Sequence, residues 1–123
     1  MFEIKIDKET RGFQPGEVIR GQIDCGGETN ATSVEIRLLW TTSGKGTRDT
    51  MIVEELVKSV EPGTRRIAFE LVAPRRPYSF SGKLVTLDWE IEATLLPSRN
   101  TSSVQVMIGP DAHEVRLQYA KDS

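Results

Sequence analysis

Residues 85–95 read VTLDWEIEATL, and this stretch decides the fold class. Apolar residues occupy every second position from Val85 to Leu95, with threonine, aspartate or glutamate between them. Alternation over this length is typical of a strand with one buried face, because the apolar stripe of a helix recurs every three or four residues. The preceding residues, 74–82 (PRRPYSFSG), are rich in proline and predict a tight corner at 79–82. We therefore expect residues 85–95 to form the central strand of a two-sheet sandwich.

Shorter alternating segments lie on both sides of this strand. They are residues 2–6, 17–24, 33–41, 51–60, 67–71, 104–108 and 114–119. Seven or eight short strands with turn signals between them, and no helical stripe of useful length, predict an all-β, immunoglobulin-like antiparallel β-sandwich. Gly21 inside a strand predicts a bulge or a close backbone approach. The slip of apolar phase at Glu54 and Glu55 predicts a bulge or an edge strand.

The connections between these segments are read from their turn residues. Pro15 followed by Gly16 predicts a tight turn, since proline presets the first central dihedral and glycine accepts a positive φ. Residues 25–32, 42–49 and 97–103 are polar or glycine-rich, and the sequence predicts a loop at each.

Length and composition limit the class of protein. A chain of 123 residues is expected to form one domain, residues 1–123, with enough apolar residues for one continuous core. A formal net charge of -2 gives no bulk attraction to nucleic acid or acidic membranes. The single Cys25 excludes an internal disulfide, and no apolar run approaches the ~20 residues of a membrane-spanning helix. The expected location is the cytoplasm.

Few residues offer catalytic or metal-binding chemistry. His113 is the only histidine, whereas a nucleophile–base pair or a metal cluster normally draws on several such groups. Cys25 has no basic neighbour in sequence to lower its thiol pKa, so a buried structural cysteine is favoured over a reactive thiol. We expect no metal and no cofactor.

Three acids share one face of the central strand. Asp88, Glu90 and Glu92 could act as paired catalytic carboxylates, but the face is open, and Arg37 is expected to face them if residues 33–41 pair with this strand. A solvated sheet face is therefore favoured over a hydrolase site. Trp40 and Trp89 both have inward parity, which favours core packing over an exposed sugar-binding platform.

Two separated motifs together resemble arrestin-like domains. Residues 13–23 (FQPGEVIRGQI) are similar to the F-x-P-G-E opening of that family, and residues 78–82 (YSFSG) with the following strand are similar to its P-x-S-F-x-G corner. The resemblance covers residues 2–95. It implies an arrestin-like, immunoglobulin-type sandwich that works by binding other proteins, without catalysis. The two-domain activation switch of the family and its Pro-Pro-x-Tyr motif have no counterpart in these residues.

A basic rim of loops is the candidate binding surface. In a sandwich of sequential antiparallel strands alternate loops share an end, so the loops after the first, third and fifth strands are expected to lie together. The first loop brings Lys8 and Arg11 to this end, and the rim also holds the acids Asp7, Glu9 and Asp49. The cations predicted to bind are Lys45, Arg48, Arg75, Arg76 and Lys83. Arginine forks there could bind an acidic or phosphorylated peptide by bidentate contacts.

The function expected from the sequence is that of a non-catalytic protein-interaction module, an adaptor or scaffold that binds acidic or extended peptides. An edge strand is a second route, by addition of a partner's extended segment to the sheet. Self-association through an edge or a face stays open. The alternative from another class is a small-ligand or carbohydrate-binding sandwich, which would need an exposed tryptophan.

Overall fold

The computed structural model describes residues 2–25, 30–44, 46–82, 85–110 and 115–116. In this part of the chain there is no α-helix, and the ordered elements are strands. Seven strands have four residues or more: β1 (Glu3–Ile6), β3 (Val18–Asp24), β4 (Ser33–Gly44), β5 (Thr47–Ser59), β6 (Arg66–Val72), β8 (Thr86–Leu96) and β9 (Asn100–Ile108). Three have two residues: β2 (Gly12–Phe13), β7 (Phe80–Ser81) and β10 (Val115–Arg116). The all-β prediction is confirmed.

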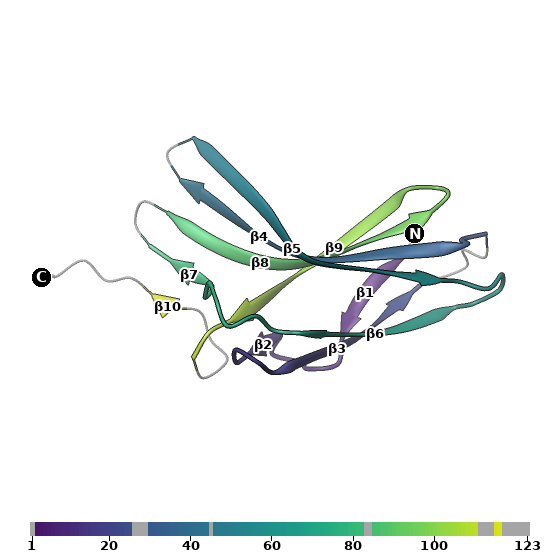
Figure 1. Cartoon of the computed structure of the whole chain (residues 1–123), viewed down its shortest axis with the longest axis horizontal. Helices are drawn as coiled ribbons and strands as arrows, with labels where there is room; N and C mark the ends of the chain where they lie inside the picture. The colour runs from purple at the N-terminus through teal and green to yellow at the C-terminus, as the bar shows by residue number, and fades with distance from the viewer. Residues whose placement is uncertain (1, 26–29, 45, 83–84, 111–114, 117–123) are drawn as a thin grey trace, which may run out of the picture.

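The strands form two layers (Figure 1). The small sheet has the order β1-β3-β6, and the large sheet has the order β10-β7-β8-β4-β5, with β9 beside β8 and β2 beside β9. Strand β8 is central, as predicted: β4 pairs with its whole length on one side, and β7 and β9 share the other.

The N-terminal segment is joined directly to β9, which lies about 95 residues later in the sequence. Strand β2 pairs in parallel with the last two residues of β9, Met107 and Ile108. The Ser102 hydroxyl donates a hydrogen bond of 3.0 Å to the carbonyl oxygen of Phe2, which lies 100 residues away in the sequence. The sandwich is thus closed by contacts between distant parts of the chain.

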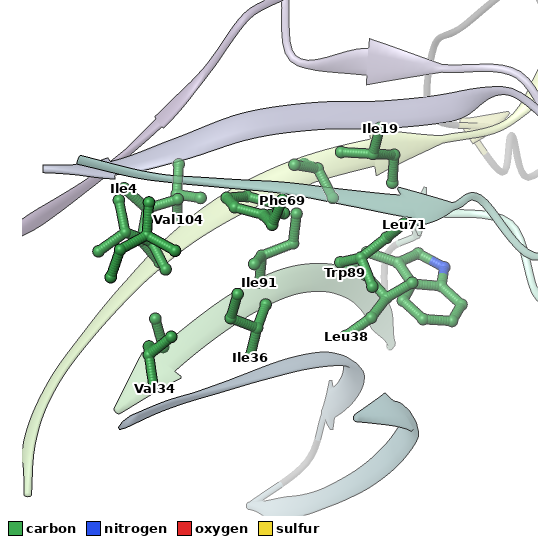
Figure 2. Close-up of a cluster of buried hydrophobic side chains, with 14 of the residues drawn as sticks. Ile4, Ile19, Val34, Ile36, Leu38, Phe69, Leu71, Trp89, Ile91 and Val104 are labelled. Carbon is green, nitrogen blue, oxygen red and sulfur yellow. The ribbon is translucent and has the colours of Figure 1, made fainter. Parts of the chain in front are cut away.

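The core lies between the inner faces of the two sheets (Figure 2). Every second residue of β8 is buried, from Leu87 through Trp89 to Leu95, which confirms the predicted alternation. Ile19 and Phe69 of the small sheet pack against this face. Val85 is the exception to the predicted stripe: it precedes β8 and is exposed, because the regular strand begins only at Thr86.

The two tryptophans lie side by side but differ in burial. Trp40 of β4 pairs across the sheet with Trp89 of β8, so both face inward as predicted. The Trp89 side chain is fully buried, and its indole N–H donates a hydrogen bond of 2.8 Å to the carbonyl oxygen of Pro77. Trp40 is only half-buried against the core, since it lies on the part of β4 toward the end of the β4–β5 hairpin.

Gly21 confirms the predicted close approach. It lies in β3, opposite Phe69 of β6 and Ile6 of β1. A Cβ atom at this position would lie 2.7 Å from Phe69 Cζ and 2.8 Å from the carbonyl oxygen of Lys5. Only glycine fits between an aromatic ring and a neighbouring strand at these distances.

The turn before β3 is closed by its own glutamate. Gly16 has a φ of 87°, and the Glu17 amide donates a 3.0 Å hydrogen bond to the Gln14 carbonyl, as the Pro-Gly pair predicts. The Glu17 carboxylate accepts hydrogen bonds from Lys8 Nζ at 2.8 Å and from the Gln14 amide at 2.9 Å. These two bonds lower the pKa of Glu17, the bond from Lys8 most strongly.

The lowered pKa of Glu17 predicts an acid-sensitive contribution to stability. Because the folded-state pKa is below the unfolded one, the contribution is complete above the unfolded value, about 4.3 for a free glutamate, and is lost as pH falls through the folded pKa. We expect the gap in unfolding free energy between wild type and Glu17→Gln to shrink as pH falls below about 5. The gap is below about 1 kcal/mol, since the pair is partly exposed. Urea titrations at several pH values measure it. In a Lys8→Met background the gap should vary less with pH; an unchanged variation would contradict the proposed cause.

Two predicted loops are wrong in extent. Residues 42–49 were expected to connect two strands loosely, but β4 runs to Gly44 and β5 begins at Thr47, so the pair closes as a tight hairpin with Gly46 at a φ of 82°. Threonine is a good strand residue, and Thr41 and Thr50 join the strands by a hydroxyl contact of 3.2 Å.

The expected loop at residues 97–103 is also short. Strand β9 begins at Asn100, which pairs with Leu95, and Thr94 and Thr101 make a hydroxyl contact of 3.1 Å. The polar residues of this segment predict a loop, but they are paired in a hairpin whose outer face is solvated. The third expected loop, residues 25–32, is buried at Cys25 and Ala31, and residues 26–29 lie outside the described part.

Candidate interaction surfaces

The predicted basic rim is described only in part. Arg48, Arg75 and Arg76 are exposed, and Lys45 and Lys83 lie outside the described residues. The tip of the β4–β5 hairpin and strand β7 lie at the same end of the molecule (Figure 1), in line with the expected sharing of an end. Arg48 pairs with Ser43, which pairs with Thr86 at the start of β8. Binding by these arginines stays a prediction.

Arg75 and Arg76 are followed by two residues, Pro77 and Ser79, that are hydrogen-bonded to the core strands. The carbonyl oxygen of Pro77 accepts the Trp89 indole bond, and Ser79 makes two hydrogen bonds with Ile108, through its amide at 2.7 Å and its hydroxyl at 3.0 Å. The arginines are therefore presented to solvent from a backbone whose following residues are tied to β8 and β9.

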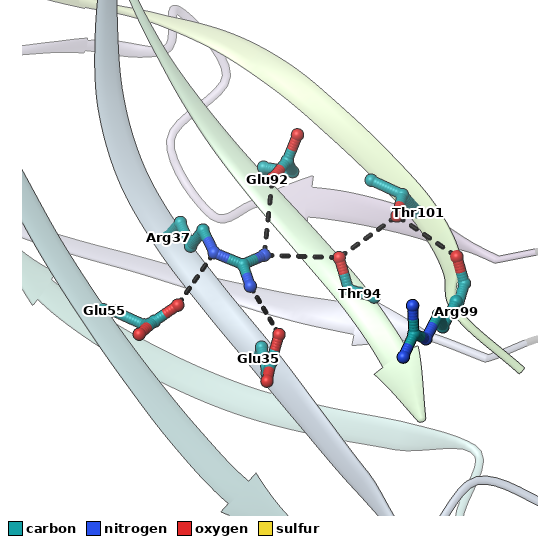
Figure 3. A network of polar contacts seen from close by, with 7 residues as sticks. All are labelled: Glu35, Arg37, Glu55, Glu92, Thr94, Arg99 and Thr101. Atoms are coloured by element: carbon teal, nitrogen blue, oxygen red, sulfur yellow. Dashed lines mark hydrogen bonds and ion pairs between the residues drawn. The ribbon is translucent and has the colours of Figure 1, made fainter. Parts of the chain in front are cut away.

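The outer face of the large sheet carries a charged network centred on Arg37 (Figure 3). Arg37 Nε contacts Glu55 at 2.8 Å, Nη1 contacts Glu92 at 3.4 Å, and Nη2 donates to Glu35. Nη1 also lies 3.4 Å from the Thr94 hydroxyl. The predicted pairing of Arg37 with the acids of the central strand is confirmed for Glu92, which lies directly opposite Arg37.

Arg37 is held in its charged form by these acids. Burial of its side chain, which is 19% exposed, opposes the charge, but the hydrogen bond to Glu35 and the charges of Glu35, Glu55 and Glu92 outweigh burial and raise its pKa. Three carboxylates share one guanidinium, so the network keeps a net negative charge. Asp88 and Glu90 extend the acidic surface along β8, and the Gln105 amide donates to Asp88 at 3.1 Å.

Strand β5 forms a second candidate surface. The sequence indicated it only by the slip of apolar phase at Glu54 and Glu55. Within the described residues it pairs with β4 and with no other strand, so it forms an edge of the large sheet, as predicted. Four of its apolar side chains are exposed: Met51 by 54%, Ile52 by 54%, Val53 by 40% and Val57 by 62%. A long edge strand with exposed apolar residues is a template for another strand.

The predicted bulge is located at Val53. Leu38 pairs with Glu54 and Leu39 pairs with Ile52, which leaves Val53 as the extra residue. The bulge moves Glu55 onto the outer face, opposite Arg37, beside Ile52 and Val57, which pair with Leu39 and Glu35. Without it, each residue of β5 after Val53 would lie on the opposite face, and Glu54 would lie opposite Arg37 in place of Glu55.

The structure also bears on the residues considered for metal binding, thiol chemistry and sugar binding. The described residues contain no group of three or more metal-ligating side chains, and Cys25 is buried as favoured from the sequence. His113 lies outside the described part. Full burial of Trp89 removes it as a sugar-binding platform, and Trp40 packs against the core. No helix among the described residues is both long and apolar enough to cross a membrane.

Comparison with known proteins bears on the fold. No family model and no curated protein matches this sequence. Among solved structures, the sporulation control protein Spo0M from Bacillus subtilis matches with a TM-score of 0.61 at 15% identity, over 89% of this chain and 49% of Spo0M. This chain thus spans about half the length of Spo0M, and the likeness supports the β-sandwich.

Two other solved structures are less similar to this chain than Spo0M is. Superoxide reductase (neelaredoxin) from Ignicoccus hospitalis matches at 11% identity with a TM-score of 0.46, over 86% of this chain and 80% of that protein. A β-glucosidase from Listeria innocua matches at 14% identity with a TM-score of 0.44, over 89% of this chain and 16% of the enzyme. What the comparisons show is that this chain is an antiparallel β-sandwich similar in fold to part of Spo0M.

Proposed function

We propose that this chain is an arrestin-like domain that acts as a non-catalytic protein-interaction module, and that it binds an extended segment of a partner protein along the edge of β5. The arrestin-like assignment is supported by the motifs at residues 13–23 and 78–82 and by the likeness to Spo0M, whose fold is arrestin-like. A cytoplasmic location is part of the proposal.

The observation that carries the proposal is the edge of β5. A strand added to an exposed edge gains main-chain hydrogen bonds, which supply affinity, while alternate side chains supply specificity. Strand β5 has 13 residues, and Ile52 and Val57 present exposed apolar surface on its outer face. Burying such side chains against a partner strand contributes about 25 cal/mol per Å² of apolar surface.

The basic rim offers a second route for acidic peptides. Arg48, Arg75 and Arg76 are exposed, and guanidinium groups bind carboxylate or phosphate by two parallel hydrogen bonds. The two routes predict different sequence preferences and different sensitive residues, so one experiment separates them.

Selection from a random peptide library tests the edge. We expect wild type to enrich peptides with alternating apolar residues, and Ile52→Lys together with Val57→Lys to weaken their binding at least tenfold, because lysine on an edge strand opposes pairing. Val72→Lys is the matched control, since Val72 is 55% exposed but lies on β6 of the other sheet. Hydrogen exchange should show new protection in β5.

Two other outcomes would contradict binding at the edge of β5. If the β5 double variant binds the selected peptides as wild type does, the edge is not the site. If instead Arg75→Ser with Arg76→Ser abolishes binding and the peptides are acidic, the rim is the site.

A further inference from the structure

We infer that the segment recognised at β5 carries a basic residue between two apolar residues at alternate positions, in the order apolar-x-basic-x-apolar. This inference rests on the proposed function and specifies its partner. It follows from which side chains the bulge at Val53 places on the outer face of β5.

The register fixes the order of the side chains that an added strand would meet. Three successive outer-face positions of β4, namely Leu39, Arg37 and Glu35, pair with Ile52, Glu55 and Val57 of β5. A strand added to β5 would continue the same rows, about 4.8 Å away. Its alternate outer-facing residues therefore lie beside an apolar, an acidic and an apolar side chain. The pattern is symmetric, so it holds for a parallel or an antiparallel partner.

The charge of this row favours a base at the central position. Arg37 is surrounded by Glu35, Glu55 and Glu92, so three carboxylates meet one guanidinium and the row keeps a net negative charge. The Glu55 side chain is 48% exposed, and one of its oxygens contacts Arg37 Nε. A carboxylate has acceptor sites for a second donor. A lysine or arginine of a partner would therefore bind Glu55 without displacing Arg37.

A second copy of this chain fits the row less well than a basic segment. Lys58 is flanked by Leu56 and Val60, which is the required spacing. However, Lys58 pairs with Val34 on the inner face, and its ammonium donates a 2.6 Å hydrogen bond to the carbonyl oxygen of Ala68. Cross-strand neighbours share a face, so Lys58 of one copy does not meet Glu55 of another.

Two labelled nine-residue peptides test the inference. One carries Val-Thr-Arg-Thr-Val at its centre, and the other carries Val-Thr-Glu-Thr-Val. We expect wild type to bind the arginine peptide about tenfold more tightly than the glutamate peptide at low salt, with the difference falling as salt is added. Fluorescence anisotropy measures both affinities. Glu55→Gln should remove most of the preference, and Glu55→Lys should reverse it.

Controls separate failure of the inference from failure of the proposed function. Glu61→Gln removes the same charge from the turn after β5 and should keep the preference. Equal binding of both peptides, abolished by Ile52→Lys, would overturn the charge rule and leave strand addition standing. Binding of neither peptide would count against both proposals. Sedimentation that shows a dimer resistant to both peptides would assign the edge to a second copy.

Discussion

Replacing Trp89 with alanine is expected to lower the free energy of unfolding by about 3–5 kcal/mol, as for other large buried side chains. The indole is fully buried beneath the small sheet, and its N–H satisfies the carbonyl oxygen of Pro77. Alanine would leave a cavity and a buried acceptor without its donor. Urea unfolding followed by far-ultraviolet circular dichroism measures the loss without relying on tryptophan emission.

Trp40 provides the matched control, because it lies directly across the sheet from Trp89 but is only half-buried. Trp40→Ala should cost clearly less. Trp89→Phe, which removes the indole donor and part of the ring system, should fall between wild type and Trp89→Ala. Equal losses for Trp40→Ala and Trp89→Ala would show that the assigned burial is wrong.

Gly21→Ala is expected to destabilise the protein by about 1–3 kcal/mol, the usual range for overpacking. Strand propensity alone predicts the opposite sign, since alanine normally improves on glycine inside a strand by about 0.5–1 kcal/mol. The difference arises because the added methyl group would meet the Phe69 ring and the Lys5 carbonyl oxygen at under 3 Å. Thermal and urea unfolding both report the change.

A double-mutant cycle identifies the cause of this effect. Phe69→Leu shortens the side chain that Gly21→Ala would meet, so the double variant should be more stable than the sum of the two single losses predicts. Rescue should be partial, because the Lys5 carbonyl oxygen belongs to the backbone of β1 and stays in place. Strict additivity would exclude the ring contact as the cause.

The sequence predicted the elements whose apolar residues face one side. Strands β4 and β8 were found because their inward residues, among them Ile36, Leu38 and Ile91, are buried at every second position. The pairing of Arg37 with Glu92 of β8 followed from the same alternation, since neighbouring strands share a face.

The ends of the hairpins could not be predicted in this way. At the hairpin ends, in residues 42–44, 47–50 and 100–103, polar residues and glycine occupy both faces, so alternation disappears although pairing continues. Polar composition then resembles that of a loop. Cross-strand threonine pairs were the available signal, because β-branched residues favour strands.

The sequence predicted that β5 is irregular, but it did not predict which side chains lie on the outer face of β5. The slip at Glu54 and Glu55 indicated a bulge or an edge, and both are present. Which side chains share the outer face depends on the residue that is extra, and the sequence alone does not distinguish Val53 from its neighbours. The order of Ile52, Glu55 and Val57 therefore required the register.

The pairing of β2 with β9 also has a consequence for folding during synthesis. A chain emerging from the ribosome has its first thirteen residues available long before residues 107 and 108 are made, so β2 and β9 pair only after residue 108 has been added. Until then the β4–β5 hairpin is the largest unit that contacts between sequence neighbours can build. Nascent chains halted before residue 100 should consequently lack the closed sandwich and expose apolar surface to chaperones.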